Sequence, residues 1–370
     1  MAEPLRNIYN DIFFAELGIA LQKAVLGFPV KRFVSAVKNS HWPAMELKQR
    51  MRQLSTTLHD YLEGSYKKKL TAVLKIMKAL PANTAIMYPG LAYMFIPDFV
   101  EQYGLADIDT SLQAMEKINF ITSCEFAVRP FLILEQEQVM KQMLLWSRHP
   151  HENIRRFASE GCRPRLPWAL AVPALKRNPS PVLPILENLK DDPSVYVQRS
   201  VANHLNDISK DHPELVMTLA KKWQGSSAAA DWIIKHGCRG LLKKGHIDAL
   251  GLFGTGAHIK CDVKKIALSA AKLKIGEQLQ FEFSLSLKEK EPARLRVEYA
   301  VYYIKANGNL SKKVFKINEC LYHPGKAQHI VRRHSFKDLT TRKHYAGNHI
   351  ISIVVNGNEL AKAGFSLTGQ

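Results

Sequence analysis

One stretch of the sequence combines residue types that can bind a phosphate and a sugar. It reads Phe157-Ala-Ser-Glu160-Gly-Cys-Arg163-Pro-Arg165-Leu-Pro-Trp168, so two arginines, two prolines and a tryptophan follow a Glu-Gly pair. Because proline restricts the backbone to extended forms, this segment should be stiff, with Arg163, Arg165 and Trp168 projecting from it. Guanidinium groups suit phosphates, and an indole face suits a sugar or a cation. Trp168 could equally be an apolar anchor between helices.

Three carboxylates are candidates for catalysis. Glu125 lies in Ser-Cys-Glu-Phe-Ala-Val-Arg-Pro, Glu160 precedes the two arginines, and Asp207 lies in Asn-His-Leu-Asn-Asp-Ile. A carboxylate held against a sugar can stabilise an oxocarbenium-like transition state and position water. The alternatives are structural, because Glu125 at a helix start would interact with the helix dipole and Asp207 could be a solvated or capping group. Taken singly, no carboxylate identifies a catalytic site.

Other chemistries are poorly supported by the sequence. It contains no Gly-rich phosphate loop, no HExxH or GxSxG motif, and no His/Cys cluster at metal-ligand spacing, so we expect neither a metal nor a cofactor. The five cysteines show no CxxC spacing, which argues against a disulfide scaffold and suits a reducing compartment. A disulfide between Cys261 and Cys320 is rejected on the same grounds.

The location of the protein is predicted from its apolar segments. The N-terminus lacks the apolar core of a secretory signal. The longest uncharged stretch, 79–97, is interrupted by prolines and does not fit a membrane span. We expect a cytoplasmic protein with no membrane partner.

The charge of the chain favours a polyanionic partner. It has 52 Lys and Arg against 33 Asp and Glu, a net charge of +19. Cations that neutralise phosphates release condensed counterions, and this release drives binding to nucleic acid. Residues 259–370 carry +11 of the excess, 123–258 carry +5 and 1–122 carry +3. A merely solubilising basic surface is the alternative.

The first two thirds of the chain have helical periodicity. From Pro4 to about Leu252 apolar residues recur three or four positions apart, as in the runs 47–61, 70–80 and 108–118. The segment that starts at Pro150 resembles the one that starts at Pro193, 43 residues later. This period is typical of HEAT-like repeats, in which stacked helix pairs form a curved solenoid.

The repeat predicts a set of cations on the solenoid. Arg156 and Arg199 occupy equivalent positions in the two copies, so successive turns would present cations to a phosphate backbone. Lys235 belongs to a weaker third copy, and with Arg239 it completes the DNA contacts predicted for the helical part. An accidental match between two amphipathic helices is the alternative.

The remaining third alternates with period two. The runs 278–287 and 295–304 alternate between apolar and polar residues, and 349–355 ends in Asn356-Gly357, a strong hairpin signal. About seven strands in this length predict an immunoglobulin-like sandwich. We therefore expect a multidomain protein with an all-α HEAT-like domain over 1–255 and an all-β Ig-like domain over 259–370.

Three segments together resemble a known family. They are the run from Glu125 to Phe131, the run from Arg156 to Trp168, and the run from Asp192 to Asp207. They resemble the AlkC-type bacterial DNA alkylation-repair glycosylases, which are relatives of the AlkD type, and a subset of which carries an added Ig-like domain. The resemblance covers the whole helical part and extends to the C-terminus.

The resemblance implies a function and roles for single residues. The protein would be a DNA glycosylase that removes the N3-methylated bases 3-methyladenine and 3-methylcytosine without flipping the damaged nucleotide. Glu125 and Asp207 look like the catalytic carboxylates, Trp168 like the aromatic that faces the deoxyribose, and Glu160 falls in the same motif. The backbone-binding residues would be Arg156, Arg163 and Arg165. Besides Trp168, the sequence shows no further tryptophan equivalent to the aromatic pair of the AlkD type.

The sequence predicts a monomer whose partner is double-stranded DNA with alkylated bases. The strongly basic Ig-like domain would form a second DNA-binding surface, through Lys312, Lys313, Arg332 and Arg333. A different class of protein remains possible on fold alone, namely a non-catalytic DNA-binding or protein-interaction scaffold, because HEAT solenoids are commonly adaptors.

Overall fold

The computed structural model describes residues 4–81, 83–253, 259–339 and 342–369. The chain divides into two compact units. The first comprises the described residues up to His212 together with Trp223–Gly237, and the second comprises Pro213–Lys222 and the described residues from Cys238 onward. The predicted boundary between residues 255 and 259 falls on 254–258, outside the described residues, and stays a prediction.

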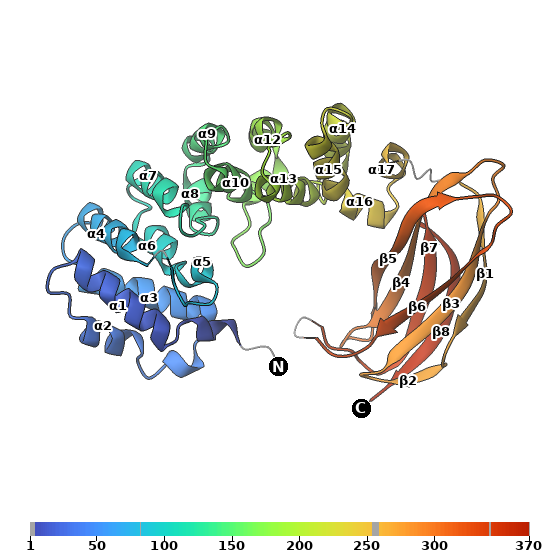
Figure 1. Ribbon diagram of the computed structural model, residues 1–370, viewed down its shortest axis with the longest axis horizontal. Helices are drawn as coiled ribbons and strands as arrows, with labels where there is room; N and C mark the ends of the chain where they lie inside the picture. The colour runs from blue at the N-terminus through green and yellow to red at the C-terminus, as the bar shows by residue number, and fades with distance from the viewer. Residues whose placement is uncertain (1–3, 82, 254–258, 340–341, 370) are drawn as a thin grey trace. The chain divides into compact units, whose positions relative to one another are not determined.

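The first unit is built of short helices, as the periodicity predicts (Figure 1). Its elements are η1 (Leu5–Ile8), α1 (Asp11–Ala24), α2 (Val30–Val37), η2 (Trp42–Ala44), α3 (Leu47–Tyr61), α4 (Tyr66–Ala79), α5 (Pro89–Ala92), α6 (Phe95–Tyr103), α7 (Ile108–Ile118), α8 (Val128–Leu134), α9 (Gln136–Trp146), α10 (Glu152–Glu160), α11 (Pro173–Arg177), η3 (Ser180–Val182), α12 (Leu183–Leu189), α13 (Val195–Ile208) and α15 (Ala228–Gly237).

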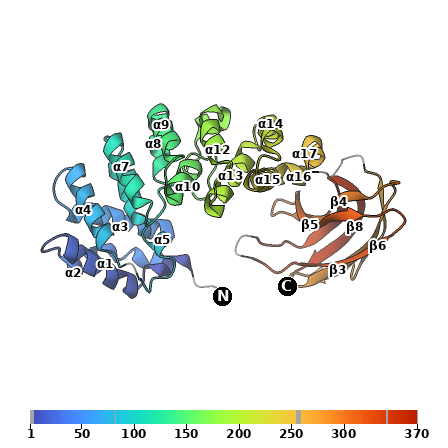
Figure 2. The ribbon, with the colours of Figure 1, turned by 45° about the horizontal axis from the view of Figure 1, so that its top comes forward.

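These helices stack in pairs that bury the predicted apolar faces. α1 packs on α4, α3 on α6, α10 on α13, and α13 on α15. In Figures 1 and 2, α7, α9 and α12 lie along one edge of the row, whereas α8, α10 and α13 lie along the other. The three runs predicted to be helical correspond to α3, α4 and α7, so these predictions are confirmed.

The predicted internal repeat is visible in the helices. α10 and α13 begin at Glu152 and Val195, 43 residues apart as in the sequence match, and they lie against each other. Apolar residues of both helices are buried between them, among them Ile154, Phe157 and Val197. The repeat therefore brings the ends of α10 and α13 together, and with them Glu160 and Asp207.

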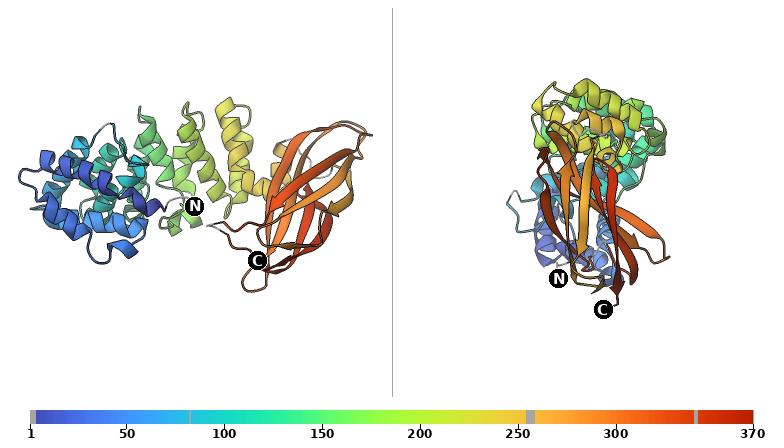
Figure 3. Two further views of the ribbon diagram at one scale, coloured as in Figure 1. Left: turned by 60° about the horizontal axis from the view of Figure 1, so that its bottom comes forward. Right: turned by 90° about the vertical axis from the view of Figure 1, so that its right-hand side faces the viewer.

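The second unit contains the sandwich and helices α14 (Pro213–Trp223), α16 (Arg239–Lys244) and α17 (Ile247–Leu252). Its strands are β1 (Cys261–Leu268), β2 (Lys272–Lys274), β3 (Gln278–Leu287), β4 (Ala293–Ile304), β5 (Leu310–Tyr322), β6 (Gln328–Ser335), β7 (Gly347–Val355) and β8 (Asn358–Thr368). They form two sheets, one in the order β1-β3-β6 and another in the order β2-β8-β7-β4-β5. Figure 3 shows these strands from two further sides. The all-α part followed by an Ig-like sandwich is thus confirmed.

Two of the strand predictions had different outcomes. β3 alternates between buried and less buried residues, and the Asn356-Gly357 pair forms the turn between β7 and β8 with φ of 48° and 81°. β4, by contrast, is buried without interruption from Leu295 to Val301. Arg296 and Glu298, two of the polar residues of this run, form a buried ion pair of 2.7 Å. Two side chains of opposite charge that pair with each other can lie on a buried face of a strand. A period-two pattern alone therefore does not show whether the polar face is buried or solvated.

A close approach of two glycines joins the sandwich to α16 and α17. Gly245, at the end of α16, has a φ of 73°, and a Cβ there would lie 3.0 Å from the Cα of Gly357. The side chain of Leu250 on α17 also lies next to Gly357. Both positions require glycine, because each combines a left-handed backbone with a neighbouring backbone too near for a side chain.

Candidate active site

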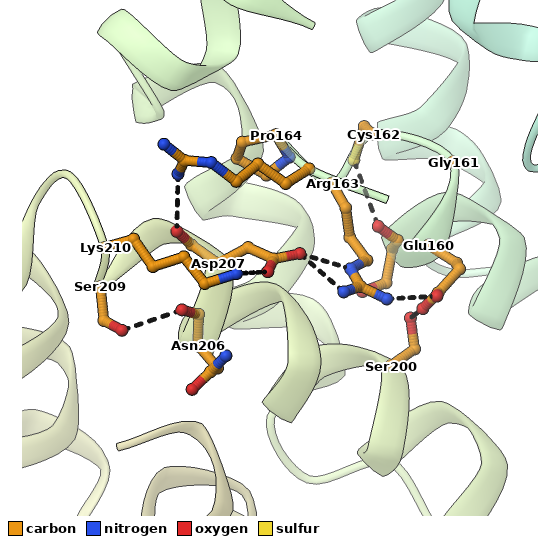
Figure 4. A network of polar contacts seen from close by, with 12 residues as sticks. Glu160, Gly161, Cys162, Arg163, Pro164, Ser200, Asn206, Asp207, Ser209 and Lys210 are labelled. Atoms are coloured by element: carbon orange, nitrogen blue, oxygen red, sulfur yellow. Dashed lines mark hydrogen bonds and ion pairs between the residues drawn. The ribbon is translucent and has the colours of Figure 1, made fainter. Parts of the chain in front are cut away.

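Arg163 lies between two of the predicted carboxylates (Figure 4). Its guanidinium group is 2.5 Å from Glu160 Oε1 through Nη1, and Nε and Nη2 lie 2.8 and 2.7 Å from Asp207 Oδ2. The second oxygen of Glu160 accepts a hydrogen bond of 2.6 Å from Ser200, and that of Asp207 one of 2.8 Å from Lys210. Every carboxylate oxygen of Glu160 and Asp207 therefore has a partner, from α13 or from the residues that follow α10 and α13.

Arg156 makes the corresponding link to the third carboxylate. It donates to Glu125 through Nη1, which also lies 2.8 Å from Ser123 Oγ, and its Nη2 is 3.6 Å from Glu160 Oε1. Ser123 in turn donates to Glu125 at 2.6 Å. Burial alone would lower the pKa of Arg156, but the carboxylates of Glu125 and Glu160 raise it above its usual value. The guanidinium group therefore keeps its charge.

The structure thus joins all three predicted carboxylates in one carboxylate–arginine network: Glu125, Arg156, Glu160, Arg163 and Asp207. The exposed fraction of the carboxylate side chains falls along the network, from 16% at Glu125 to 7% at Glu160 and 3% at Asp207. Buried charges are costly unless they are paired and hydrogen-bonded, and this alternation of signs pairs each of them. The solvated alternative for Asp207 is excluded, because this side chain is buried. Glu125 lies in the turn before α8, where an interaction with the helix dipole adds to its ion pair with Arg156.

Burial also affects a histidine beside this network. His204 on α13 is fully buried, and this burial, with a further contribution from Arg163, lowers the pKa of His204 to about 3. An unfolded chain would protonate this side chain below about pH 6.5. The free energy of unfolding should therefore decrease as the pH falls from 6.5 towards 3, with about a tenfold change in the unfolding equilibrium per pH unit from this residue.

Urea unfolding between pH 7 and pH 4 would measure this dependence. His204→Leu should have a shallower pH dependence than the wild type by about one bound proton. Equal slopes in the two proteins would contradict the assignment.

Trp168 is exposed rather than anchored between helices. It lies in the segment between α10 and α11, and 61% of its surface is accessible. Its φ is 67°, a left-handed conformation that is rare for a bulky residue. The backbone oxygen of Trp168 accepts a hydrogen bond of 2.7 Å from Lys48 on α3. The apolar-anchor alternative for Trp168 is therefore excluded.

A cavity of about 280 Å³ opens beside Glu125 and Arg156. Its lining combines hydrogen-bonding side chains with apolar ones: Leu91, Met94, Asn119, Ile121, Thr122, Ser123, Asn153 and Tyr196. Tyr196, which the sequence reasoning missed, is 47% exposed, and the Arg156 guanidinium lies 5.0 Å from the centre of its ring. The sequence did contain a signal for Tyr196. It is an aromatic residue in the first turn of α13, next to the apolar position Val197 and outside the apolar pattern that predicts the core.

The remaining predicted cations of the helical part differ in their surroundings. Arg165 pairs with both oxygens of Asp211, while Arg199 on α13 and Lys235 on α15 are exposed. Arg239, at the start of α16 in the second unit, is partly buried. Arg156 and Arg163 differ from these residues in their burial, because their side chains are only 13% and 8% exposed, against 31% for that of Arg165.

The sandwich has a basic cavity of its own, of about 360 Å³. It is lined by Tyr303, Ile304, Lys305, Ala306, Ser311, Lys312, Lys313, Arg342, Lys343 and Tyr345. Lys312 and Lys313 are exposed, and Lys312 forms an ion pair with Glu359. Arg332 and Arg333 lie exposed on β6, where Arg333 donates to Gln280 at 3.0 Å.

Other kinds of site were searched for in the described part of the chain. It contains no group of three or more His, Cys, Asp and Glu residues placed to hold a metal ion. Its five cysteines are all free thiols, and Cys261 and Cys320 lie on strands of different sheets. None of its helices is long and apolar enough to span a bilayer.

Comparison with known proteins extends this description. Residues 262–369 match the family model described as "Uncharacterised protein YhaZ, C-terminal Ig-like domain". The chain is 43% identical over 353 residues to the uncharacterized protein YhaZ of Bacillus subtilis (strain 168), covering 95% of this chain and 96% of that protein.

A solved structure is similar over the full length. It is the alkylpurine DNA glycosylase AlkC of Pseudomonas fluorescens, bound to DNA containing an abasic site analogue. The two share 34% sequence identity with a TM-score of 0.92, over 99% of this chain and 100% of that one. With its helical repeats and its C-terminal sandwich, the chain belongs to the AlkC-type family, in the subset that carries an Ig-like domain.

Proposed function

We propose that the protein is a DNA glycosylase of base excision repair. It hydrolyses the N-glycosidic bond of cationic N3-methylated bases, 3-methyladenine and 3-methylcytosine, without flipping the damaged nucleotide. The observation that carries the proposal is the carboxylate–arginine network, which brings three dispersed carboxylates together. The similarity to AlkC, whose structure contains DNA, supports the same partner and alkylated bases as the substrate class.

The chemistry follows from the charge of the lesion. Methylation at N3 makes the base cationic, so it leaves as a neutral molecule and needs no proton from the protein. The rate then depends on stabilising the positive charge that develops on the deoxyribose and on positioning water. Carboxylates fixed in advance in a partly dry site can contribute about 3–4 kcal/mol each, by analogy with other electrostatic stabilisers. An undamaged base is neutral and leaves far more slowly, so the lesion itself supplies part of the selectivity.

The three carboxylates have different access to the sugar. Glu125 is the most exposed of them and lines the cavity, so we assign to it the direct contact with the sugar or the attacking water. Glu160 and Asp207 are more enclosed and contribute through their negative charge. Trp168 supplies an exposed aromatic ring near a developing cation, worth about 1–2 kcal/mol.

Arg156 and Arg163 take a different role from the one that the sequence suggested. Both were predicted to contact the DNA backbone, yet their side chains are only 13% and 8% exposed, and their donors are directed at Glu125, Glu160 and Asp207. We propose that they position the carboxylates. Contacts to the DNA backbone are assigned instead to the other predicted cations: Arg165, Arg199, Lys235, Arg239, Lys312, Lys313, Arg332 and Arg333.

The role of the sandwich as a second DNA-binding surface can be tested at single residues. Replacing Lys313 by Gln should weaken binding to methylated and undamaged DNA alike, and should lower the slope of log affinity against log salt by about one. Lys326→Gln is the matched control, because Lys326 is exposed beyond the opposite end of β5. A salt titration of both variants decides the matter, and equal slopes for Lys313→Gln and the wild type would remove Lys313 from the DNA contacts.

Release of methylated base from alkylated duplex DNA tests the proposed function itself. The wild-type protein should release 3-methyladenine and 3-methylcytosine as free bases, measured by chromatography, with no release from unmethylated DNA. Binding to DNA without release of any base would instead favour the non-catalytic scaffold.

A further inference from the structure

Arg129 is a fully buried arginine whose hydrogen bonds reach a single segment of the chain. It lies in the first turn of α8, four residues after Glu125. Its guanidinium group donates to three backbone oxygens: to Gly161 at 3.1 Å, to Pro164 at 3.4 Å, and to Leu170 through Nε. All three oxygens belong to the segment 161–172 between α10 and α11, which carries Arg163 and Trp168.

This segment has little regular structure to hold it. Two of its internal backbone hydrogen bonds join Ala169 to Leu166 and Val172 to Pro164, each at 3.2 Å. Trp168 adopts a left-handed backbone conformation, which costs free energy for a residue with a side chain and persists only where the surroundings enforce it. An outside contact is therefore needed to keep this conformation, and Arg129 and Lys48 supply two.

The burial of Arg129 is itself costly. Burial lowers the pKa of Arg129 to about 10, because the charged form loses its hydration. An apolar side chain would fill the same space without this cost, but it could not bond three carbonyl oxygens. The planar guanidinium group, with five donors in a fixed arrangement, suits a contact of this kind.

We propose that Arg129 is a positioning residue that fixes the 161–172 segment and so sets the position of the exposed Trp168 indole relative to the carboxylate–arginine network, whose Arg163 lies on the same segment. Lys48 holds the same segment from α3 through the backbone oxygen of Trp168. The catalytic consequence rests on the proposed glycosylase function, whereas the structural part does not.

Amide hydrogen exchange without DNA tests the structural part. In Arg129→Lys the charge remains, but a single ammonium group cannot reach three carbonyl oxygens. The amides of Ala169 and Val172 should then exchange at least tenfold faster than in the wild type. Arg155→Lys is the matched control, because Arg155 also donates to two backbone oxygens, those of His149 and Pro150, at 3.0 and 2.7 Å, but outside this segment. Unchanged exchange at Ala169 and Val172 would overturn the inference.

Single-turnover base release tests the catalytic part. Arg129→Lys should slow release about as much as Trp168→Ala does, with DNA affinity changed less than threefold. In the Trp168→Ala background, Arg129→Lys should have no further effect on the rate. Additive losses would overturn a role through Trp168, because a merely structural defect would slow both backgrounds equally.

Two further outcomes keep the tests separate. If Arg129→Lys does not fold, Lys48→Met replaces it, since Lys48 is exposed and lies outside the core. Lys48→Met should accelerate amide exchange at Ala169 and slow base release. Normal exchange together with normal release would overturn the inference. If the wild type releases no base, the proposed function fails, and the exchange data alone then decide whether Arg129 holds the segment.

Discussion

Glu125→Gln is expected to slow the single-turnover release of methylated base by about 10²–10³-fold, the usual effect of removing one preorganised electrostatic group. The amide keeps the size of the side chain and its hydrogen bond from Ser123, but it removes the negative charge beside the cavity. DNA affinity should change little, because a carboxylate does not attract a phosphate backbone. The measurement is base release with enzyme in excess over DNA, together with a binding titration.

Glu152→Gln is the matched control for this variant. Glu152 is an exposed carboxylate at the start of α10, the helix that also carries Arg156 and Glu160, and it pairs with Ser194. The same change of charge there should leave the rate within about twofold. Equal rates for Glu125→Gln and the wild type would remove Glu125 from the mechanism, even if DNA binding persisted.

Arg163→Met should cost about 3–5 kcal/mol of stability, as removal of one member of a buried ion pair does. The change leaves Glu160 and Asp207 facing each other without the cation between them. Base release should fall together with stability, because the two carboxylates would repel each other and move apart. Urea unfolding at pH 7 measures the first effect and single-turnover release the second.

Two comparisons sharpen this expectation. Arg163→Lys keeps the charge but cannot bond both carboxylates as the guanidinium does, so an intermediate loss is expected. Arg199→Met removes an exposed arginine from α13 and should weaken DNA binding without loss of stability. An Arg163→Met protein as stable as the wild type but weak in DNA binding would restore the backbone-contact role that the sequence suggested.

The architecture could be predicted from the sequence because it rests on local patterns. Helical spacing before residue 252 and period-two alternation after 260 distinguish the two parts, and the 43-residue repeat places α10 against α13. The Asn356-Gly357 pair predicts its hairpin because both residues tolerate positive φ. β4 was less predictable, since its second face is covered and contains a charged pair.

The residues of the candidate site were predictable, but the ion pairs that join them were not. The resemblance to a family pointed to Glu125, Glu160, Asp207 and Trp168, yet no spacing rule shows that arginines join the carboxylates. Arginine is mostly exposed in proteins, so an arginine in a basic sequence is predicted to contact DNA rather than to pair with a buried carboxylate. Arg129 passed unnoticed for the same reason, although it lies inside one of the family-like runs.

The most direct test of the central claim is the affinity for a cationic sugar. Duplex DNA with a pyrrolidine abasic analogue mimics the positive charge of the oxocarbenium-like state, and the neutral tetrahydrofuran analogue is its control. The wild-type protein should bind the cationic DNA at least tenfold more tightly than the neutral DNA, and Glu125→Gln should lose most of this preference. Equal affinity of the wild type for both DNAs would contradict the claim that Glu125, Glu160 and Asp207 act together on one deoxyribose.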